Sequence, residues 1–485
     1  MRKSDPLRPS WLRNAGVIAG IVLLSMTAFI AICLVAASTR GAVQRNEIEA
    51  AIADGSIGYG FYWPFGPRTK NYIYNFNDCL IFDMLVIPEN GNLLSRAISP
   101  MMPSRPNLSP GGPDGFPPYS QCRDLKAATS AAITGKIHPS SYYSYYHRYL
   151  HGGWLICGIL LGFLPVFAAS CLLMAILVLQ IGILALVPMF RAGHHNARGR
   201  DTAFATLAIV LAAFWAIPAW DWSFSFAPGD IVIVGFLLLF YFRPPSLMSE
   251  MGFVAACTTF GVLTAIFEFL TGGIPGGFAV LLAVLAFDSY PDGHALRKRA
   301  VLAIAAFTAA IILSFAVKMT LVAFIWGPSE LFRAADVLLG HLGSIDWDLA
   351  PDKAAILNRY GITVEAIRSS RALSTLYGLF KMEYFTSNMA WGSLALGVAI
   401  TTLAPAVLAT RQGMRWKNQD AAGRWRTAIL LLAAAVPLLW CCIFVQHTIA
   451  SAHFMFRIMV WPPAVLLAAE LQRRHATRAL SLPFI

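Results

Sequence analysis

The sequence predicts an all-α polytopic membrane protein with about ten transmembrane helices. Hydrophobic residues make up 57% of the 485 residues, and charged residues only 13%. A soluble domain carries about a quarter charged residues. Apolar stretches recur along the chain at lengths near the roughly 20 residues that a spanning helix needs. Only helices and closed barrels satisfy their own backbone amides inside a bilayer, so these stretches favour helices.

The predicted spans are residues 14–38, 168–190, 202–219, 230–242, 251–270, 275–287, 299–317, 389–410, 427–445 and 455–471. The segments at 230–242 and 275–287 are short for a span. The first segment is longer than the core of a signal peptide and lacks a small-residue cleavage site. We therefore expect it to be a retained anchor.

Charge patterning predicts the orientation. The net charge is +12. Basic residues cluster near 191–200, 297–299, 411–426 and 473–478, whereas the alternating connectors at 220–229, 271–274 and 446–454 contain no Lys or Arg. By the positive-inside rule both termini are cytoplasmic. We interpret the charge as a topology signal and as contact with membrane lipids, not as a nucleic-acid footprint.

This topology divides the chain into five parts. Residues 1–38 contain the cytoplasmic N-terminus and the first span, and residues 39–167 form a first extracytoplasmic loop that ends in an interfacial helix near 154–165. Residues 168–317 contain spans two to seven, and residues 318–388 form a second extracytoplasmic loop. Residues 389–485 contain the last three spans and the cytoplasmic C-terminus. In the second loop, Ser329 and Pro351 are each expected to open a helix. Such long connections are commonly functional.

Two of the eight cysteines, Cys79 and Cys122, lie in an external loop, and the other six lie in or beside apolar segments. An oxidising compartment would allow these two to form a disulfide. Such a bond would hold the Pro-rich stretch at 97–119 close to Asp78.

Asp78 lies among amides in the mostly apolar run Asn75–Leu85. A carboxylate held there could act as general base on a sugar hydroxyl, or help to bind a divalent cation. The alternative is a turn or a helix cap, where Asn and Asp are both favoured.

The run Tyr142–Trp154 precedes an apolar segment and contains His147, Arg148 and His151. An interfacial belt explains its aromatic residues. It does not explain the three basic ones. His147 and His151 are spaced i, i+4, which on a helix would bring both to one face, able to contact a phosphate or a metal.

Glu268 lies at the outer end of the fifth predicted span. An ionisable residue in an apolar helix costs about 2.5 to 3.5 kcal/mol near the bilayer centre and by default marks a functional site. The alternative is that Glu268 simply reaches water at the helix end.

His447, His453 and Arg457 lead into the last predicted span. His453 and Arg457 share a helix face, and His447 would join them only from a non-helical loop. A lipid-linked phosphate could pair with the guanidinium in bidentate fashion, and the alternative is snorkelling to ordinary lipid. Lys318, at the outer end of the seventh span, belongs with this basic group.

These motifs together resemble a group of poorly characterised bacterial multi-pass membrane proteins. The resemblance rests on the Asn-rich segment with Asp78, the run His147-Arg148-Tyr149-Leu150-His151-Gly152, the Gly-x-x-Thr-x-x-Phe-Glu-Phe-Leu-Thr of the fifth span and the late His-x5-His-x3-Arg. In that group the second motif more often reads Arg-Tyr-Trp-His-Gly and the acid of the third is often Asp. Leu150 and Glu268 depart from this pattern. The layout also resembles GT-C-type glycosyltransferases that use polyprenyl-phosphate sugars.

The resemblance implies a GT-C-like enzyme of the bacterial inner (cytoplasmic) membrane. It would transfer a sugar from a polyprenyl-phosphate donor to an envelope glycan or other acceptor at the extracytoplasmic face. Asp78 would be the catalytic base and Glu268 a second acid. The basic residues Lys318, His447, His453 and Arg457 would stabilise the departing phosphate, and His147, Arg148 and His151 would hold the donor headgroup or a bridging metal.

Three alternatives remain open. A polysaccharide polymerase or ligase would use the same lipid carriers, but its large Arg-rich loop is expected late in the chain. A transporter or flippase would show paired halves with charges near mid-membrane. A non-catalytic assembly factor would need none of the ionisable residues in apolar segments. No Walker sequence or phosphate-binding Gly-rich loop points to a nucleotide.

Overall fold

The computed structural model is almost entirely helical. It describes residues 10–39, 42–53, 73–86, 92–103, 143–147, 149–190, 198–213, 224–267, 272–342, 363–386, 399–450 and 456–481. Within these ranges the only strands are two segments of three residues each. The prediction of an all-α membrane protein is confirmed at this level.

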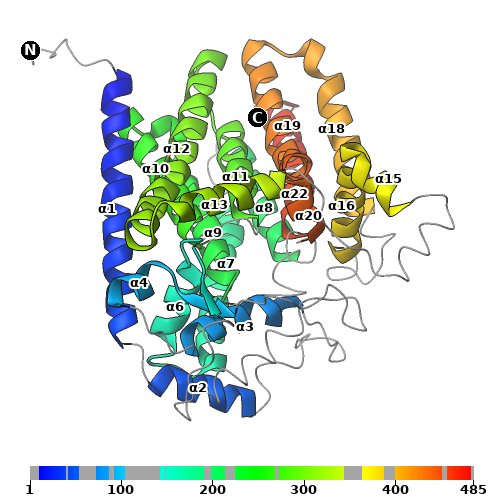
Figure 1. The fold of residues 1–485 in the computed structure, drawn as a ribbon. Helices are drawn as coiled ribbons and strands as arrows, with labels where there is room; N and C mark the ends of the chain where they lie inside the picture. The colour runs from blue at the N-terminus through cyan, green and yellow to red at the C-terminus, as the bar shows by residue number, and fades with distance from the viewer. Residues whose placement is uncertain are drawn as a thin grey trace, which may run out of the picture.

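Five described helices are long and apolar enough to cross a membrane. They are α1 (Ser10–Thr39), α7 (Val166–Phe190), α10 (Glu250–Phe267), α12 (Gly293–Trp326) and α19 (Ala421–Ile443). Figure 1 shows α1 at one edge of the bundle that they form. The helices α9 (Ala227–Phe242) and α11 (Gly273–Phe287) are apolar but shorter. Ten spans are therefore not confirmed, and four of the expected ones, 202–219, 251–270, 389–410 and 455–471, include residues outside the described ranges.

The longest helix, α12, differs from the predicted span 299–317. It begins after Asp292, whose carboxylate accepts a hydrogen bond from the backbone N–H of Ala295 at 2.7 Å, as an N-cap does. It ends at Gly327, whose φ of +99° is strained for any residue with a Cβ. Lys318 therefore lies inside the helix and not at the start of a loop. The next helix, α13 (Ser329–Leu342), begins at the predicted serine.

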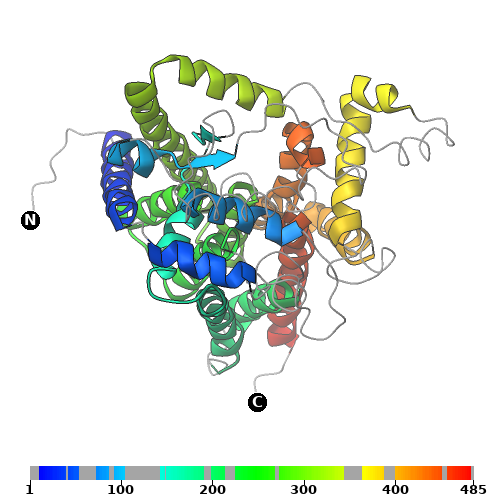
Figure 2. The ribbon, with the colours of Figure 1, turned by 60° about the horizontal axis from the view of Figure 1, so that its bottom comes forward.

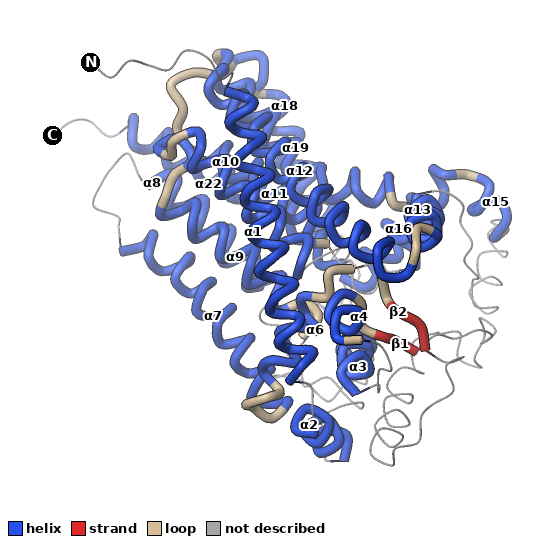
Figure 3. Tube along the Cα trace, turned by 60° about the vertical axis from the view of Figure 1, so that its left-hand side comes forward, coloured by secondary structure: helices blue, strands red, loops and turns tan. Residues whose placement is uncertain are grey.

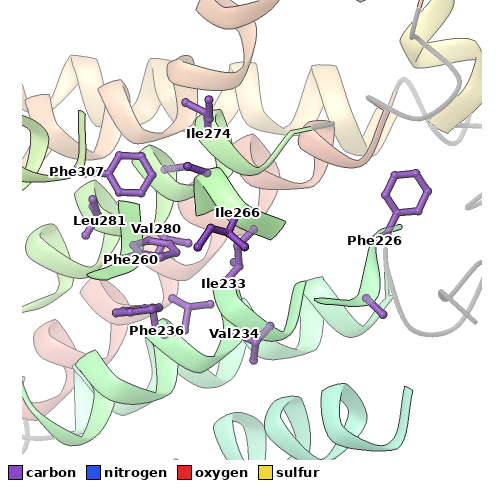
Figure 4. Packing of buried hydrophobic residues seen from close by; sticks show 14 of the residues in the cluster. Phe226, Ile233, Val234, Phe236, Phe260, Ile266, Ile274, Val280, Leu281 and Phe307 are labelled. Carbon is purple, nitrogen blue, oxygen red and sulfur yellow. The ribbon is translucent and has the colours of Figure 1, made fainter. Parts of the chain in front are cut away.

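The centre of the bundle is packed around Phe307 of α12. A Cβ at Gly261 of α10 would lie 2.6 Å from the Phe307 backbone oxygen, and a Cβ at Gly277 of α11 would lie 2.4 Å from the Phe307 ring. Small residues allow such close approach, which stabilises helix pairs where lipid offers no hydrophobic driving force. Phe260 and Phe236, stacked with ring centroids 4.4 Å apart, continue this layer toward α9 (Figure 4).

Short elements lie at one end of the bundle (Figures 1 and 2). They are α2 (Ala42–Ala53), α3 (Ile73–Val86), α4 (Leu93–Ile98), α6 (Gly152–Leu160) and the antiparallel strands β1 (Met101–Pro103) and β2 (Tyr143–Tyr145). The strands pair Met101 with Tyr145 and Pro103 with Tyr143. The stretch 154–165, predicted to be an interfacial helix, is helical only as far as Leu160, the end of α6. Trp154 and Cys157 of α6 are buried, and α6 packs on α3.

The beginning of α1 lies at the opposite end of the bundle (Figures 1 and 3), which is also the end towards which the last described helix runs. Asn14 Nδ2 donates to Glu250 Oε1 at 2.9 Å, and Lys298 Nζ donates to Glu250 Oε2 at 2.6 Å, so α1, α10 and α12 begin side by side. Gln472 of α22 (Trp461–Ser481) donates to the carbonyl of Phe287, the last residue of α11. The remaining described elements are α8 (Arg198–Leu211), η3 (Pro245–Leu247), α15 (Val364–Ser369), α16 (Arg371–Thr386), η5 (Ala399–Leu403), α18 (Ala404–Met414), η6 (Trp416–Asn418), α20 (Val445–Ala450) and η7 (Phe456–Val460).

Candidate functional site

The structure describes six of the predicted site residues: Asp78, His147, His151, Lys318, His447 and Arg457. Arg148, Glu268 and His453 lie outside the described residues, as does Cys122. Cys79 is disulfide-bonded. The cysteines with free thiols among the described residues are Cys33, Cys157, Cys171, Cys257, Cys441 and Cys442, and of these only Cys442 is exposed.

Asp78 lies inside α3, so the alternative of a turn or a cap is wrong. Its Oδ1 accepts a hydrogen bond from the backbone N–H of Ser225 at 3.1 Å. One turn later, the Phe82 ring meets Phe224 edge to face, with centroids 5.7 Å apart. Burial raises the pKa of the Cys157 thiol in α6, and the charge of Asp78 raises that pKa further. Asp78 is thus held between α6 and the turn that precedes α9.

Arg457 of η7 forms an ion pair with Asp230 in the first turn of α9. Both side chains are buried, and the guanidinium carbon lies 4.4 Å from the centroid of the Phe226 ring. A cation over an aromatic face is favourable, more so where water is excluded. The sequence suggested that a lipid phosphate pairs with Arg457. In the structure, the carboxylate of Asp230 pairs with it. Asp230 was missed, although a carboxylate in so apolar a helix was the signal that could have identified it.

Asp78 and Arg457 both contact residues at the start of α9. One contacts Ser225 and the other contacts Phe226, which are consecutive residues. The start of α11 also approaches η7, because a Cβ at Gly272 would lie 2.5 Å from the side chain of Ile458, the residue after Arg457. The segment that ends at Gly272 contains Glu268, which is outside the described residues.

A second group of hydrogen-bonded side chains lies around Lys318. Its Nζ donates to the carbonyl of Ile98 and to Ser99 Oγ, the latter at 3.1 Å. Ser99 Oγ in turn lies 2.9 Å from His147 Nδ1. Lys318 and Ser99 are both buried. The ammonium therefore ties the segment between α4 and β1 to α12, and the serine hydroxyl connects it to His147.

The imidazole of His147 is neutral near pH 7. Burial, followed by the charges of Lys318 and Arg333, lowers its pKa to about 4. The Glu330 carboxylate favours the protonated form, but at 3.9 Å from Nε2 it is too far for a hydrogen bond, and Arg333 Nη1 contacts it at 3.1 Å. Burial and the two cations therefore outweigh the Glu330 carboxylate, and the pKa of His147 stays below its ordinary value. The Trp326 ring lies 4.5 Å from the imidazole, centroid to centroid.

His151 does not share a helix face with His147. His147 follows strand β2 in a turn, and His151 is the N-cap of α6 with φ +58° and ψ +37°. The prediction of a helical i, i+4 pair is therefore wrong, because pairing with β1 draws the preceding tyrosines into a strand. His151 Nε2 lies 2.6 Å from the carbonyl oxygen of Tyr146. Since a carbonyl only accepts, Nε2 carries the proton and donates it. Burial lowers the pKa of His151 well below its usual value.

His447 lies in α20, a helix, and not in the loop that the prediction required. It is buried, and α20 packs against α13 and α16. A Cβ at Gly378 of α16 would lie 3.0 Å from the side chain of Thr448, the next residue. His447 thus belongs to the part of the molecule formed by α13, α16 and α20.

A metal site does not emerge from the part of the chain that the structure describes. There, no group of three or more His, Cys, Asp or Glu side chains is placed to hold an ion. No protein-family model matches the chain, and neither a curated protein nor a solved structure matches it. The functional assignment therefore depends on the contacts around Asp78, Arg457 and Lys318.

Proposed function

We propose that this protein is an integral membrane glycosyltransferase of the GT-C-like type. It moves a sugar from a polyprenyl-phosphate donor to an envelope glycan or another acceptor at the extracytoplasmic face. The observation that carries the proposal is the convergence of a carboxylate, Asp78, and a guanidinium, Arg457, on the consecutive residues Ser225 and Phe226.

The reaction needs both charges. The acceptor hydroxyl loses its proton as its oxygen attacks the anomeric carbon, and Asp78 is the base that takes the proton. The bond from the anomeric carbon to the phosphate oxygen breaks, and the departing polyprenyl phosphate retains the electron pair. Arg457 stabilises that negative charge. A guanidinium has five N–H donors in a planar fork, which allows one edge to bind a carboxylate and another a phosphate.

The charge distribution supports an extracytoplasmic location for the site. Arg299, Arg426 and Arg473 lie at the end of the bundle where α1 begins, where Arg299 donates to the Met248 carbonyl and Arg426 to the Asp288 carbonyl. Cytoplasmic ends of spans carry the excess of Lys and Arg. The proposed orientation therefore has both termini in the cytoplasm of a bacterial inner membrane and Asp78 on the other side.

The remaining predicted residues take supporting roles in the proposal. Lys318, through Ser99, holds the segment that carries β1 against the strand that leads to His147. In the proposal, the donor headgroup binds beside β2 and α6. Glu268 is proposed as a second acid and His453 as a phosphate ligand. A divalent cation remains an open alternative for the carboxylates.

The test is reconstitution of the purified protein into liposomes with a panel of polyprenyl-phosphate sugars and an assay for release of the lipid phosphate. We expect release with at least one donor. Asp78→Asn should reduce the rate about 100-fold or more, the usual range for losing a general base. Asp292→Asn is the matched control, because Asn caps a helix as well as Asp does and Asp292 lies at the other end of the bundle.

Release at the wild-type rate in Asp78→Asn would remove Asp78 from the role of base. Transfer of labelled lipid-linked sugar across the bilayer without release of lipid phosphate would favour the transporter or flippase alternative. Formation of a long polymer from a single donor would favour the polymerase alternative.

A further inference from the structure

Three arginines converge on one buried carboxylate at the end of the bundle where α1 begins. Glu470 of α22 is contacted by Arg473 Nη2 at 2.7 Å, by Arg474 Nε at 3.0 Å and by Arg415 Nη1 at 3.1 Å. Arg473 Nε adds a second hydrogen bond, at 3.2 Å to the other carboxylate oxygen. Arg415 comes from the end of α18, 55 residues earlier in the chain. We call this group the Glu470 arginine cluster.

The cluster carries a net positive charge that faces outward. Three guanidinium groups and one carboxylate sum to +2. The Glu470 side chain is 4% exposed, whereas the arginine side chains are 37% to 53% exposed. A guanidinium has more donors than one carboxylate can accept. The buried carboxylate thus fixes three cations in one place and leaves their outer faces accessible.

Exposed apolar side chains neighbour the cluster residues in the chain. Leu467, one turn earlier on α22, is 38% exposed, and Met414 and Trp416 next to Arg415 are 67% and 37% exposed. Tryptophan is enriched where headgroups meet water. Exposed apolar side chains thus adjoin the cluster on α22 and beside Arg415, the setting in which a basic group meets lipid headgroups.

We infer that the Glu470 arginine cluster binds the phosphate of an anionic phospholipid in the leaflet on the side of the chain termini. Guanidinium groups match phosphate geometry and bind it in bidentate fashion, and anionic leaflets attract basic residues at the surface. The inference is independent of glycosyl transfer, because this cluster lies at the opposite end of the bundle from Asp78.

The experiment places the wild-type protein in nanodiscs of phosphatidylcholine, with and without phosphatidylglycerol. Thermal unfolding and the retained lipid, quantified by mass spectrometry, are both measured. We expect phosphatidylglycerol to raise the unfolding midpoint and to be enriched among the retained lipids. Arg474→Gln should weaken that binding about fivefold, the effect of one basic residue near an anionic surface. Arg333→Gln, an exposed arginine paired with Glu330 near the other end, is the matched control and should leave binding unchanged.

Glu470→Gln distinguishes a built site, in which the carboxylate holds the three arginines in place for binding, from binding by net positive charge alone. This variant has one more positive charge than the wild type but lacks the carboxylate that holds the arginines together. A built site predicts weaker retention of phosphatidylglycerol in Glu470→Gln. Tighter retention, or an equal loss in Arg333→Gln and Arg474→Gln, would overturn the inference. A full midpoint shift with inorganic phosphate in pure phosphatidylcholine nanodiscs would also overturn it, because the ligand would then be a free anion.

Discussion

Asp230 and Arg457 lie 227 residues apart in the chain and form an ion pair whose side chains are 0% and 7% exposed. The pair joins η7, at the entrance to the last helix, to the first turn of α9. A carboxylate in the first turn of a helix is favoured by the helix dipole. Each charge compensates the other where water is scarce, so neither can be removed alone without a large cost.

Breaking this pair should therefore destabilise the protein strongly. Asp230→Asn and Arg457→Met should each lower the free energy of unfolding by about 3 to 5 kcal/mol, because each leaves a buried charge without its counterion. The double variant Asp230→Leu/Arg457→Met should recover much of the loss. Thermal unfolding in detergent measures all three. Lys298→Gln, which breaks an exposed pair with Glu250, should cost at most about 1 kcal/mol. A double variant no more stable than either single one would contradict this account.

Gly261→Ala should separate α10 from α12. The added Cβ would lie 2.6 Å from the Phe307 backbone oxygen and 2.8 Å from Ala310 Cβ, and a backbone atom cannot rotate away. Overpacking of this kind costs about 1 to 3 kcal/mol. The matched control is Gly16→Ala in α1, where nothing lies within 4 Å of the added Cβ and the better helix propensity of Ala should be neutral or stabilising. Equal unfolding midpoints for the two variants would show that the helices do not meet at Gly261.

Acid should destabilise the protein through His147. The folded state binds a proton at His147 only near pH 4, whereas an unfolded His binds one near pH 6.5. Between these values the unfolded state binds more protons, so stability rises with pH. The contribution is complete above pH 6.5, is lost as the pH falls toward 4 and amounts to about 3 kcal/mol at most. His147→Gln should flatten the dependence of the unfolding midpoint on pH over this window. An unchanged slope would rule out His147 as its origin.

Lys318→Met should loosen the segment between α4 and β1. The substitution removes the donor to the Ile98 carbonyl and to Ser99 Oγ, and losing such buried bonds costs about 1 to 3 kcal/mol. Amide hydrogen exchange at residues 95–101 should speed up, which is the readout. Lys417→Met, an exposed lysine of η6, is the control and should leave exchange in that segment unchanged.

The class of protein could be predicted because it depends on composition and on apolar length, which are local properties. The second predicted span, 168–190, falls within α7 for this reason. The seventh predicted span, 299–317, was too short because the charge of Lys318 ended the apolar run, although α12 continues to Trp326. The Ile98 carbonyl and Ser99 Oγ accept hydrogen bonds from the Lys318 ammonium and so stabilise its charge. These acceptors lie about 220 residues earlier in the chain, so no local pattern reveals them.

The candidate site was predicted less well, for the same physical reason. Asp78 and Arg457 were identified as unusual charges in apolar surroundings, but their contacts with Ser225 and Phe226 depend on tertiary packing. Asp230 was taken only as the first residue of a span, because its partner is distant in sequence. The spacing of His147 and His151 suggested a helix, whereas cross-strand pairing with Met101–Pro103 decided the backbone of the preceding residues.

Cys442 provides a means to determine which compartment each end of the bundle faces. It is the exposed member of the described free thiols, and it lies at the end of α19 far from Asp420, the residue that caps the beginning of that helix. Its backbone carbonyl accepts a hydrogen bond from Arg371 at 3.3 Å, on the α16 side of the molecule. A membrane-impermeant maleimide, added to sealed right-side-out and inside-out vesicles in turn, would therefore report the sidedness of the native chain without any engineered cysteine.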